Sequence, residues 1–206
     1  MIATLLAVLA RLIAGSNARF VERPLDTRQR VYFANHSSHL DFILVWAALP
    51  PPVRRRARPV AARDYWERGP LRRYLATKIF RAVLVDRATP SESNARERGQ
   101  EAVARMIAGL GDADSLILFP EGTRGSGEQL APFKSGLYHL CRERPDLELV
   151  PVHLENLNRI LPKGEFVPVP LLSRITFGPA MALENGEPKD AFLERARDAV
   201  QRLRES

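Results

Sequence analysis

The segment N-H-S-S-H-L-D, from Asn35 to Asp41, contains the side chains best suited to acid–base chemistry. His36 can accept and release a proton near neutral pH, and Asp41 follows it by five residues. On a continuous helix five residues correspond to a rotation of roughly 140°, so we expect His36 to precede a helix whose first turn holds Asp41. The carboxylate can then orient the imidazole as a general base. A simpler hypothesis is that Ser38 and Asp41 form a capping box that stabilises the helix start.

A second polar segment, F-P-E-G-T-R-G, follows the apolar residues S-L-I-L and ends at Gly125. Its glycine permits a tight turn, its threonine offers a hydroxyl, and Arg124 offers a fork of donors that suits a phosphate or a carboxylate. We expect Glu121 to lie beside Arg124 and to hold its guanidinium. The alternative is an ordinary polar loop between a strand and a helix.

Lys134 starts a third feature, the tripeptide K-S-G just before a predicted helix. A cation at a helix N-terminus favours anion binding, although the same residues also suit simple capping of that helix.

Several other kinds of site find no match in the sequence. It has no G-x-x-x-x-G-K-[ST], no G-x-G-x-x-G, no G-x-S-x-G and no H-E-x-x-H segment. The chain has one cysteine, Cys141, so it can form no disulfide within the chain and no multi-thiolate metal site. We expect Cys141 to lie in a helix, buried or half-buried in the core. His36 and His39 are three residues apart, but only two distant histidines remain, so we expect no metal site.

The elements that must position these residues alternate along the chain. Because strands alternating with helices favour a layered α/β sheet, we expect one main domain. Strands are expected at 30–34, 58–62, 82–85, 115–119, 147–154 and 174–177, and helices at 40–49, 64–80, 89–110, 133–144 and 188–204.

The N-terminal stretch from Ile2 to Ala14 is apolar apart from Thr4 and Arg11. As a helix it would measure roughly 20 Å, too short for the ~30 Å hydrocarbon core of a bilayer. A cleaved signal peptide would carry its positive charge before the apolar run rather than near its end. Two hypotheses remain: a helix that lies in a membrane interface, or one buried in the domain core.

The 206 residues carry a net charge of +7, which favours an anionic partner: nucleic acid, a membrane or a phosphorylated substrate. The charge is local, because the segment 53–87 has eleven cations and three acids, a balance of +8, while the remainder carries −1. The cations are Arg54, Arg55, Arg56, Arg58, Arg63, Arg68, Arg72, Arg73, Lys78, Arg81 and Arg87.

The segment N-H-x-x-x-x-D followed about eighty residues later by F-P-E-G-T-R resembles the glycerolipid acyltransferase family of lysophosphatidate acyltransferases. The resemblance spans Arg30 to Phe177, and V-P-V at 150–152 matches a later apolar block of the family. The family's middle block has a glycine, a phenylalanine three residues on and an arginine three further. Only the arginine is present here, as Arg87, with Arg81 and Leu84 at the other two places.

The resemblance implies a single α/β domain over residues 17–206, with a mixed central sheet flanked by helices and an apolar helix at residues 1–16 before it. It also implies that His36 is the general base for the free hydroxyl of a lysophospholipid, 1-acyl-glycerol-3-phosphate above all, and that Asp41 orients His36. The hydroxyl would attack the thioester of acyl-CoA or acyl-carrier protein directly, with no metal or cofactor. Backbone amides near Gly122 are candidates for stabilising the oxyanion. The phosphate pocket of the acceptor would consist of Arg87, Glu121, Gly122, Thr123, Arg124 and Lys134.

A lysolipid acceptor lies in a bilayer, which favours a protein bound to the membrane surface, peripheral or monotopic, on the cytoplasmic side. The basic segment mixes its cations with apolar side chains, as helices at an anionic interface do; these are Tyr65, Trp66, Leu71, Tyr74, Leu75 and Phe80. The alternative is a solvated basic face with its aromatic residues in the core.

Three other functions remain open at this point. The altered middle block allows another acceptor, such as a lyso-ornithine lipid. A non-catalytic lipid-binding relative would not need both His36 and Asp41. A nucleic-acid-binding module would use the same arginines, but no helix-turn-helix, finger or aromatic RNP pattern accompanies them, so we expect no nucleic acid partner.

Overall fold

A mixed β-sheet forms the centre of this computed structural model, which describes residues 2–13, 15, 17–22, 26–38, 41–86, 94–125, 129–155 and 173–204. Within these ranges seven strands follow the order β1-β7-β6-β2-β5-β3-β4. Every neighbouring pair is parallel except β6 and β7, which are antiparallel. The strands are β1 (Asn17–Phe20), β2 (Arg30–Ala34), β3 (Ala57–Ala62), β4 (Val83–Val85), β5 (Ser115–Leu118), β6 (Glu148–Glu155) and β7 (Arg174–Phe177). The predicted α/β fold with a mixed sheet is therefore confirmed.

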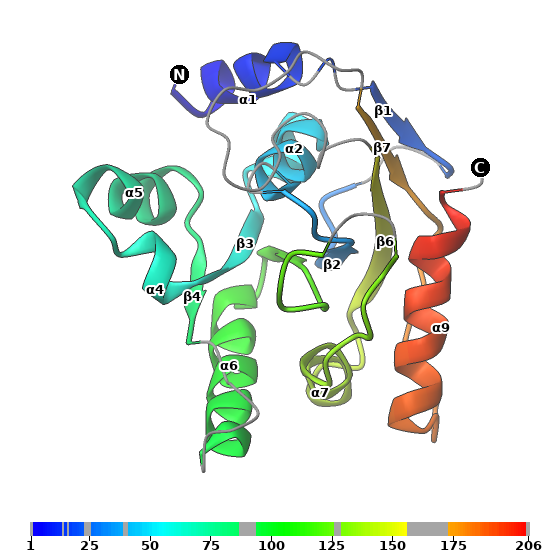
Figure 1. The fold of residues 1–206 in the computed structure, drawn as a ribbon. Coiled ribbons are helices and arrows are strands. Elements are labelled where there is room, and N and C mark those ends of the chain that lie inside the picture. Colours follow the sequence, from blue (N-terminus) through cyan, green and yellow to red (C-terminus); the bar gives the residue numbers. More distant parts are fainter. Residues whose placement is uncertain are drawn as a thin grey trace.

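Helices cover both faces of the sheet (Figure 1). Helices α1 and α2 contribute to one core cluster, and α6, α7 and α9 contribute to the other. The helices are α1 (Ile2–Ile13), α2 (Asp41–Ala48), α3 (Pro51–Arg54), α4 (Arg63–Trp66), α5 (Pro70–Tyr74), α6 (Ala95–Leu110), α7 (Gly136–Glu143) and α9 (Lys189–Arg202), with a π-helix η1 (Leu75–Ile79) after α5.

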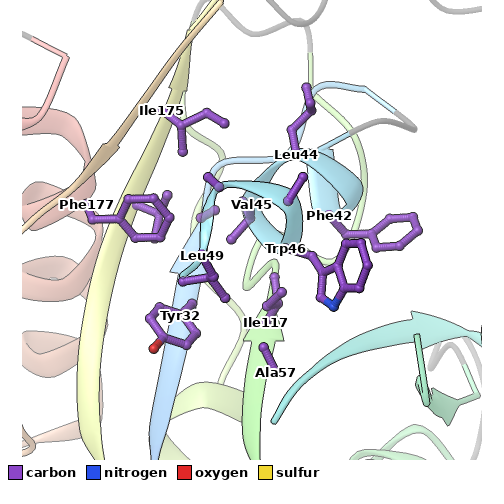
Figure 2. Close-up of a cluster of buried hydrophobic side chains, with 14 of the residues drawn as sticks. Tyr32, Phe42, Leu44, Val45, Trp46, Leu49, Ala57, Ile117, Ile175 and Phe177 are labelled. Atoms are coloured by element: carbon purple, nitrogen blue, oxygen red, sulfur yellow. The ribbon is translucent and has the colours of Figure 1, made fainter. Parts of the chain in front are cut away.

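Strand β2 is buried on both faces and separates the two clusters. Val31 and Phe33 pack against α6, α7 and α9, whereas Tyr32 and Ala34 pack against α2. This alternation follows from the two-residue period of a strand, and a strand covered on both faces is apolar throughout, as R-V-Y-F-A nearly is. Figure 2 shows Phe177 beside Val45 of α2, and Tyr32 below Leu49, the residue that follows α2.

One predicted helix is wrong. The expected helix at 64–80 is divided into α4, α5 and η1, and the break falls at Gly69 and Pro70. Gly69 has φ +91°, which a helix interior excludes, and Pro70 then begins the next helix at a position where its missing N–H is not needed.

Most other predicted boundaries agree to within two residues, and the exceptions are local. Helix α7 begins at Gly136, so Phe133 and Lys134 lie in the loop before it. Strand β1 and the short helix α3 were not predicted, because four residues are too few for a periodic signal. The expected start of the helix at 89–110 lies outside the described residues, and α6 is described from Ala95.

Helix α1 lies on α2 rather than inside the domain, so it is not the buried core helix of the second hypothesis. Ala7 is buried in the contact, and the Arg11 guanidinium donates to the carbonyl of Ala47. The apolar side chains Leu5, Val8, Leu9 and Leu12 are about half to three-quarters exposed. None of the helices in the described part of the chain is long and apolar enough to cross a bilayer.

The close approach of α6 to β4 gives a stability test. A Cβ placed on Gly109 would lie 2.3 Å from Cγ2 of Val83, whereas one on Gly99, in the same helix, would meet nothing within 4 Å. We expect Gly109→Ala to lower the free energy of unfolding by about 1–3 kcal/mol through overpacking. Gly99→Ala should raise it by about 0.5–1 kcal/mol because alanine is the better helix former. Urea denaturation measures both, and equal effects of the two substitutions would contradict the packing described here.

Candidate active site

The two polar segments meet because β2 and β5 are neighbouring parallel strands. Phe33 is in register with Leu118, so both strands end at the same edge of the sheet. The residues after β2 lead to His36, and the residues after β5 lead to Phe119 and Glu121. Ligands of open α/β sheets bind outside the carboxyl ends of the strands, and the candidate site lies there.

His36 and Asp41 form a hydrogen-bonded pair. The His36 Nδ1 atom lies 2.8 Å from Oδ2 of Asp41, whose side chain is fully buried, while 23% of the His36 side chain is exposed. The imidazole stacks on the ring of Phe119, with centroids 4.4 Å apart. An ionised carboxylate only accepts hydrogen bonds, so Nδ1 donates and Nε2 is left as the proton acceptor. This is the arrangement of a general base with its orienting carboxylate.

The same carboxylate organises the start of α2, of which Asp41 is the first residue. Oδ2 also accepts the backbone N–H groups of Ser37 and Ser38, at 2.6 and 2.8 Å. The acid thus reaches back to the chain before the helix, as in one half of a capping box. The two hypotheses for this segment are therefore compatible, since one oxygen binds both the imidazole and the turn that presents it. Oδ1 is buried and has no hydrogen-bond partner among the described residues.

Glu121 joins the two segments through the backbone. It is 4% exposed; its Oε1 accepts the N–H of His36 at 2.7 Å, and its Oε2 accepts the N–H of Ala131 at 2.9 Å. The N–H of Gly125 in turn donates to the carbonyl of His36 at 2.8 Å. The expected ion pair between Glu121 and Arg124 is not formed in the described part of the chain, because backbone donors occupy both oxygens of Glu121.

Gly122 and Lys134 are brought together as part of the same loop. Gly122 has φ +70°, and a Cβ there would lie 2.7 Å from both Cε and Nζ of Lys134. The backbone N–H of Lys134 donates to the carbonyl of Pro120 at 2.8 Å, which holds the lysine over the glycine. Thr123 is exposed and Arg124 is half-buried, and Arg124 makes no ion pair with any described residue. The expected partner Arg87 lies outside the described residues, as does His39.

Asn35 has a role that the sequence pattern did not reveal. It is buried, its Nδ2 donates to the carbonyl of Leu154 at 2.9 Å, and its Oδ1 accepts the N–H of Leu154 at 2.7 Å. The side chain therefore continues the pairing of β2 with β6 just where β2 ends. The only available signal was an asparagine directly after a strand, which also fits any turn.

Arg81, at one of the altered places of the middle block, is paired inside the chain. Its guanidinium bonds Asp114 at 2.6 Å, and its φ of +51° lies in the left-handed region, where glycine is favoured. Cys141 is buried in α7, as predicted, and burial raises the pKa of its thiol to about 12, so it is not a thiolate nucleophile at neutral pH.

A cavity of about 480 Å³ opens beside His36. Its walls come from the end of β2, from Glu121, from residues 129 and 130, from His153 in β6 and from the end of α9. Burial lowers the pKa of His153 to about 4, so this imidazole is uncharged at neutral pH.

The fold and this paired site define a family. The model of the family described as Acyltransferase matches residues 17–155, and the chain belongs to that family. The 1-acyl-sn-glycerol-3-phosphate acyltransferase of Limnanthes alba is 34% identical to it over 147 residues, 70% of this chain and 48% of that protein. The enzyme of the same name from Escherichia coli is 27% identical over 143 residues, 63% of this chain and 51% of that protein. The chain thus spans about half the length of the curated relatives it matches.

A solved structure supports the fold. The crystal structure of the 1-acyl-sn-glycerophosphate acyltransferase from Thermotoga maritima superimposes with a TM-score of 0.71 over 98% of this chain and 79% of that one. The sequence identity is 15%, so this comparison concerns the fold alone.

Because Glu121 accepts two backbone hydrogen bonds, we predict that its substitution lowers the free energy of unfolding. In Glu121→Gln one amide oxygen can replace one acceptor, but the NH₂ group faces the second backbone N–H and leaves it unpaired. We expect the free energy of unfolding to fall by about 1–3 kcal/mol, measured by urea denaturation. The control Glu194→Gln, on the exposed face of α9, should change it by less than about 0.5 kcal/mol. Equal stability of the two variants would contradict the joining role of Glu121.

Proposed function

We propose that this chain transfers an acyl group from an acyl thioester to the free hydroxyl of a lysophospholipid, with 1-acyl-glycerol-3-phosphate as the acceptor. The observation that carries the proposal is the His36–Asp41 pair, with a buried acid and a partly exposed imidazole at the edge of the sheet. Family membership and the names of the relatives support the reaction class.

The reaction requires one base and no covalent intermediate. Nε2 of His36 accepts the proton of the acceptor hydroxyl as the hydroxyl oxygen attacks the thioester carbonyl carbon, and Asp41 stabilises the imidazolium that forms. When the tetrahedral intermediate collapses, the new C–O bond remains, the C–S bond breaks, and the thiolate leaves with the proton that His36 returns. The products are a diacyl lipid and a free thiol.

The loop after β5 supplies groups for the acceptor's phosphate and for the oxyanion. We assign the cations Arg87, Arg124 and Lys134 to the phosphate of the acceptor. We assign Gly122 and Thr123 to the turn that positions these cations. Glu121 acts as a positioning residue, because its oxygens already bind backbone N–H groups. The N–H groups of Gly122 and Gly125 are bonded within the chain, whereas those of Thr123 and Arg124 have no hydrogen bond to a described residue, and we assign these two to the oxyanion.

We further propose that the surface formed by α1 and α5 binds the membrane. Leu5 and Leu12 on α1 are 68% and 73% exposed, and Leu71 on α5 is 70% exposed. Helix α1 and the π-helix η1, which directly follows α5, lie on the α2 side of the sheet, since Ala7 of α1 and Leu75 of η1 belong to or pack against the same cluster. Exposed cations adjoin α5, namely Arg68, Arg72, Arg73 and Lys78, and cations near an anionic surface contribute about 1 kcal/mol each.

The side chains of the basic segment lie in different environments, some in the core and others exposed, which the sequence did not indicate. Trp66, Leu75 and Phe80 pack against the core cluster instead of facing solvent. Arg54 is buried, and the guanidinium of Arg58 donates to the carbonyls of Arg81 and Gly109. The membrane proposal therefore rests on α1 and α5, and the arginines of α3 and β3 stabilise the fold.

Substitution of His36 tests the proposed reaction. With lysophosphatidate and a long-chain acyl-CoA, we expect the purified protein to release free thiol, and His36→Ala to reduce the rate by about 10²–10⁴-fold because general-base catalysis is lost. Thiol release is measured with a chromogenic disulfide, and circular dichroism checks folding. The control His139→Ala, in α7, should retain the wild-type rate. Full activity of His36→Ala would overturn the mechanism, and a panel of lysolipid acceptors in the same assay identifies the headgroup.

The membrane surface is tested with vesicles. We expect the double variant Leu5→Gln, Leu12→Gln to bind phosphatidylglycerol vesicles at least about tenfold more weakly, because each buried leucine contributes about 1.5–3 kcal/mol. Co-sedimentation measures the bound fraction. Val21→Gln changes an apolar side chain that is 47% exposed and lies outside α1 and α5, and this variant should bind like the wild type. If all three proteins sediment equally, α1 is not part of the membrane-binding surface.

A further inference from the structure

The cavity beside His36 is lined in part by the loop after β5, but its cationic side chains come from another part of the chain. Its walls include the side chains of Arg197, Gln201 and Arg204 at the end of α9, together with His153. Leu130 is the only aliphatic side chain among its described lining residues. An acyl chain needs an apolar wall, so this cavity suits a polar and anionic ligand.

Arg197 and Gln201 share one face of α9, and Arg204 follows two residues after the helix ends. Positions 197, 201 and 204 follow each other by four and three residues, the spacing of neighbours on a helix surface. The adjoining face is in the core, through Phe192, Ala196 and Val200. The polar residues therefore lie at the border of the buried face, where they line the cavity.

The positive charge of the cavity comes from its arginines, and the carboxylate of Glu121, which also lines it, already accepts two backbone N–H groups. The C-terminal end of a helix carries a partial negative charge that disfavours an anion, and His153 is uncharged at neutral pH. Anion binding here must therefore depend on the guanidinium groups of Arg197 and Arg204. Arg197 also donates to the carbonyl of Leu130, at 3.1 Å from Nε and 2.8 Å from Nη2, and so fixes the facing wall.

The proposed reaction has two anionic substrates, and the structure has two separate basic groups at His36. Arg124 and Lys134 belong to the loop after β5 and are not among the described residues that line the cavity. Arg197 and Arg204 reach the cavity from beyond β6, on the other side of β2 in the sheet order. A base placed between them can serve an acceptor on one side and a donor on the other.

We propose that this cavity binds the phosphopantetheine arm of the acyl donor, the group that acyl-CoA and acyl-carrier protein share, with Arg197 and Arg204 at its phosphate and His36 at its thioester end. The proposal rests on the acyltransferase function proposed above. Guanidinium groups bind phosphate through charge-assisted pairs of hydrogen bonds, and the polar wall with Gln201 matches the amide groups of the arm.

Steady-state kinetics of the full chain test this assignment. With lysophosphatidate as acceptor, Arg204→Gln should raise the KM for acyl-CoA about tenfold, since a charged hydrogen bond is lost, and leave kcat and the KM for lysophosphatidate unchanged. Acyl-pantetheine, which lacks the phosphate, should show the same KM with both proteins. Arg202→Gln removes an exposed charge at the same end of α9 and should behave like the wild type. A rise in the KM for lysophosphatidate, or no rise for either substrate, would overturn the proposal.

A second acyl donor, acyl-carrier protein, distinguishes binding of the shared phosphopantetheine arm from binding of the nucleotide of coenzyme A. Acyl-carrier protein presents the phosphopantetheine phosphate without the nucleotide of coenzyme A. An increase in KM for both donors on Arg204→Gln supports binding of the shared arm. An increase for acyl-CoA alone would show that the arginines bind the nucleotide phosphates, which contradicts the assignment.

A binding measurement without turnover distinguishes failure of the proposed donor site from failure of the proposed acyltransferase function. Calorimetric titration with coenzyme A, in the absence of lipid, should give a Kd that rises about tenfold in Arg204→Gln and in Gln201→Glu, which places a like charge in the cavity, but not in Arg202→Gln. Gln201 is exposed, so its substitution spares the core. An unchanged Kd in both cavity variants would overturn the donor site even if the wild type is active. Failure of the wild type to release thiol with any acceptor would instead refute the proposed function.

Discussion

The parallel pairing of β2 with β5 is the constraint on which the site depends. Because these strands are adjacent and in register from Val31 with Leu116 to Phe33 with Leu118, they end at one edge of the sheet. Two segments that lie about eighty residues apart in the sequence are thereby placed in contact. The stacking of His36 on Phe119 is the first contact beyond the last paired residues. Burial of both faces of β2 makes this register costly to change, since a slip by one residue would exchange its two faces.

Two buried carboxylates then convert this proximity into a defined geometry. Asp41 and Glu121 cannot remain buried without partners, because an unpaired buried charge is strongly destabilising. Asp41 binds the imidazole and the turn before α2, and Glu121 binds the backbone of His36 and of Ala131. The same hydrogen bonds that satisfy the acids hold His36 at both its ring and its backbone. The stability of the loops and the orientation of the His36 imidazole therefore have one cause.

The cations of the chain divide into groups with different environments. Arg54, Arg58 and Arg81 bond to carbonyl or carboxylate groups of the fold, whereas the cations of α5 are exposed. Arg197 and Arg204 border the cavity beside His36, and they lie far in sequence from the basic segment that dominates the net charge. Total charge favours an anionic partner, but it did not indicate which arginines face solvent or a cavity.

Most of the elements and the pairing of His36 with Asp41 could be predicted from the sequence alone. The apolar periods predicted most strands and helices, and the spacing of His36 and Asp41 required a histidine before a helix that begins with the acid. Local patterns reach this far because capping and burial act within a few residues. The partners of Glu121, the bonding of Asn35 to Leu154 and the approach of α9 to His36 became evident only from the tertiary structure. His36 and Glu121 are 85 positions apart and Asn35 and Leu154 are 119 apart, and no periodicity encodes which loop meets which. Their reason is the order of the strands in the sheet, which is set by the packing of the whole chain.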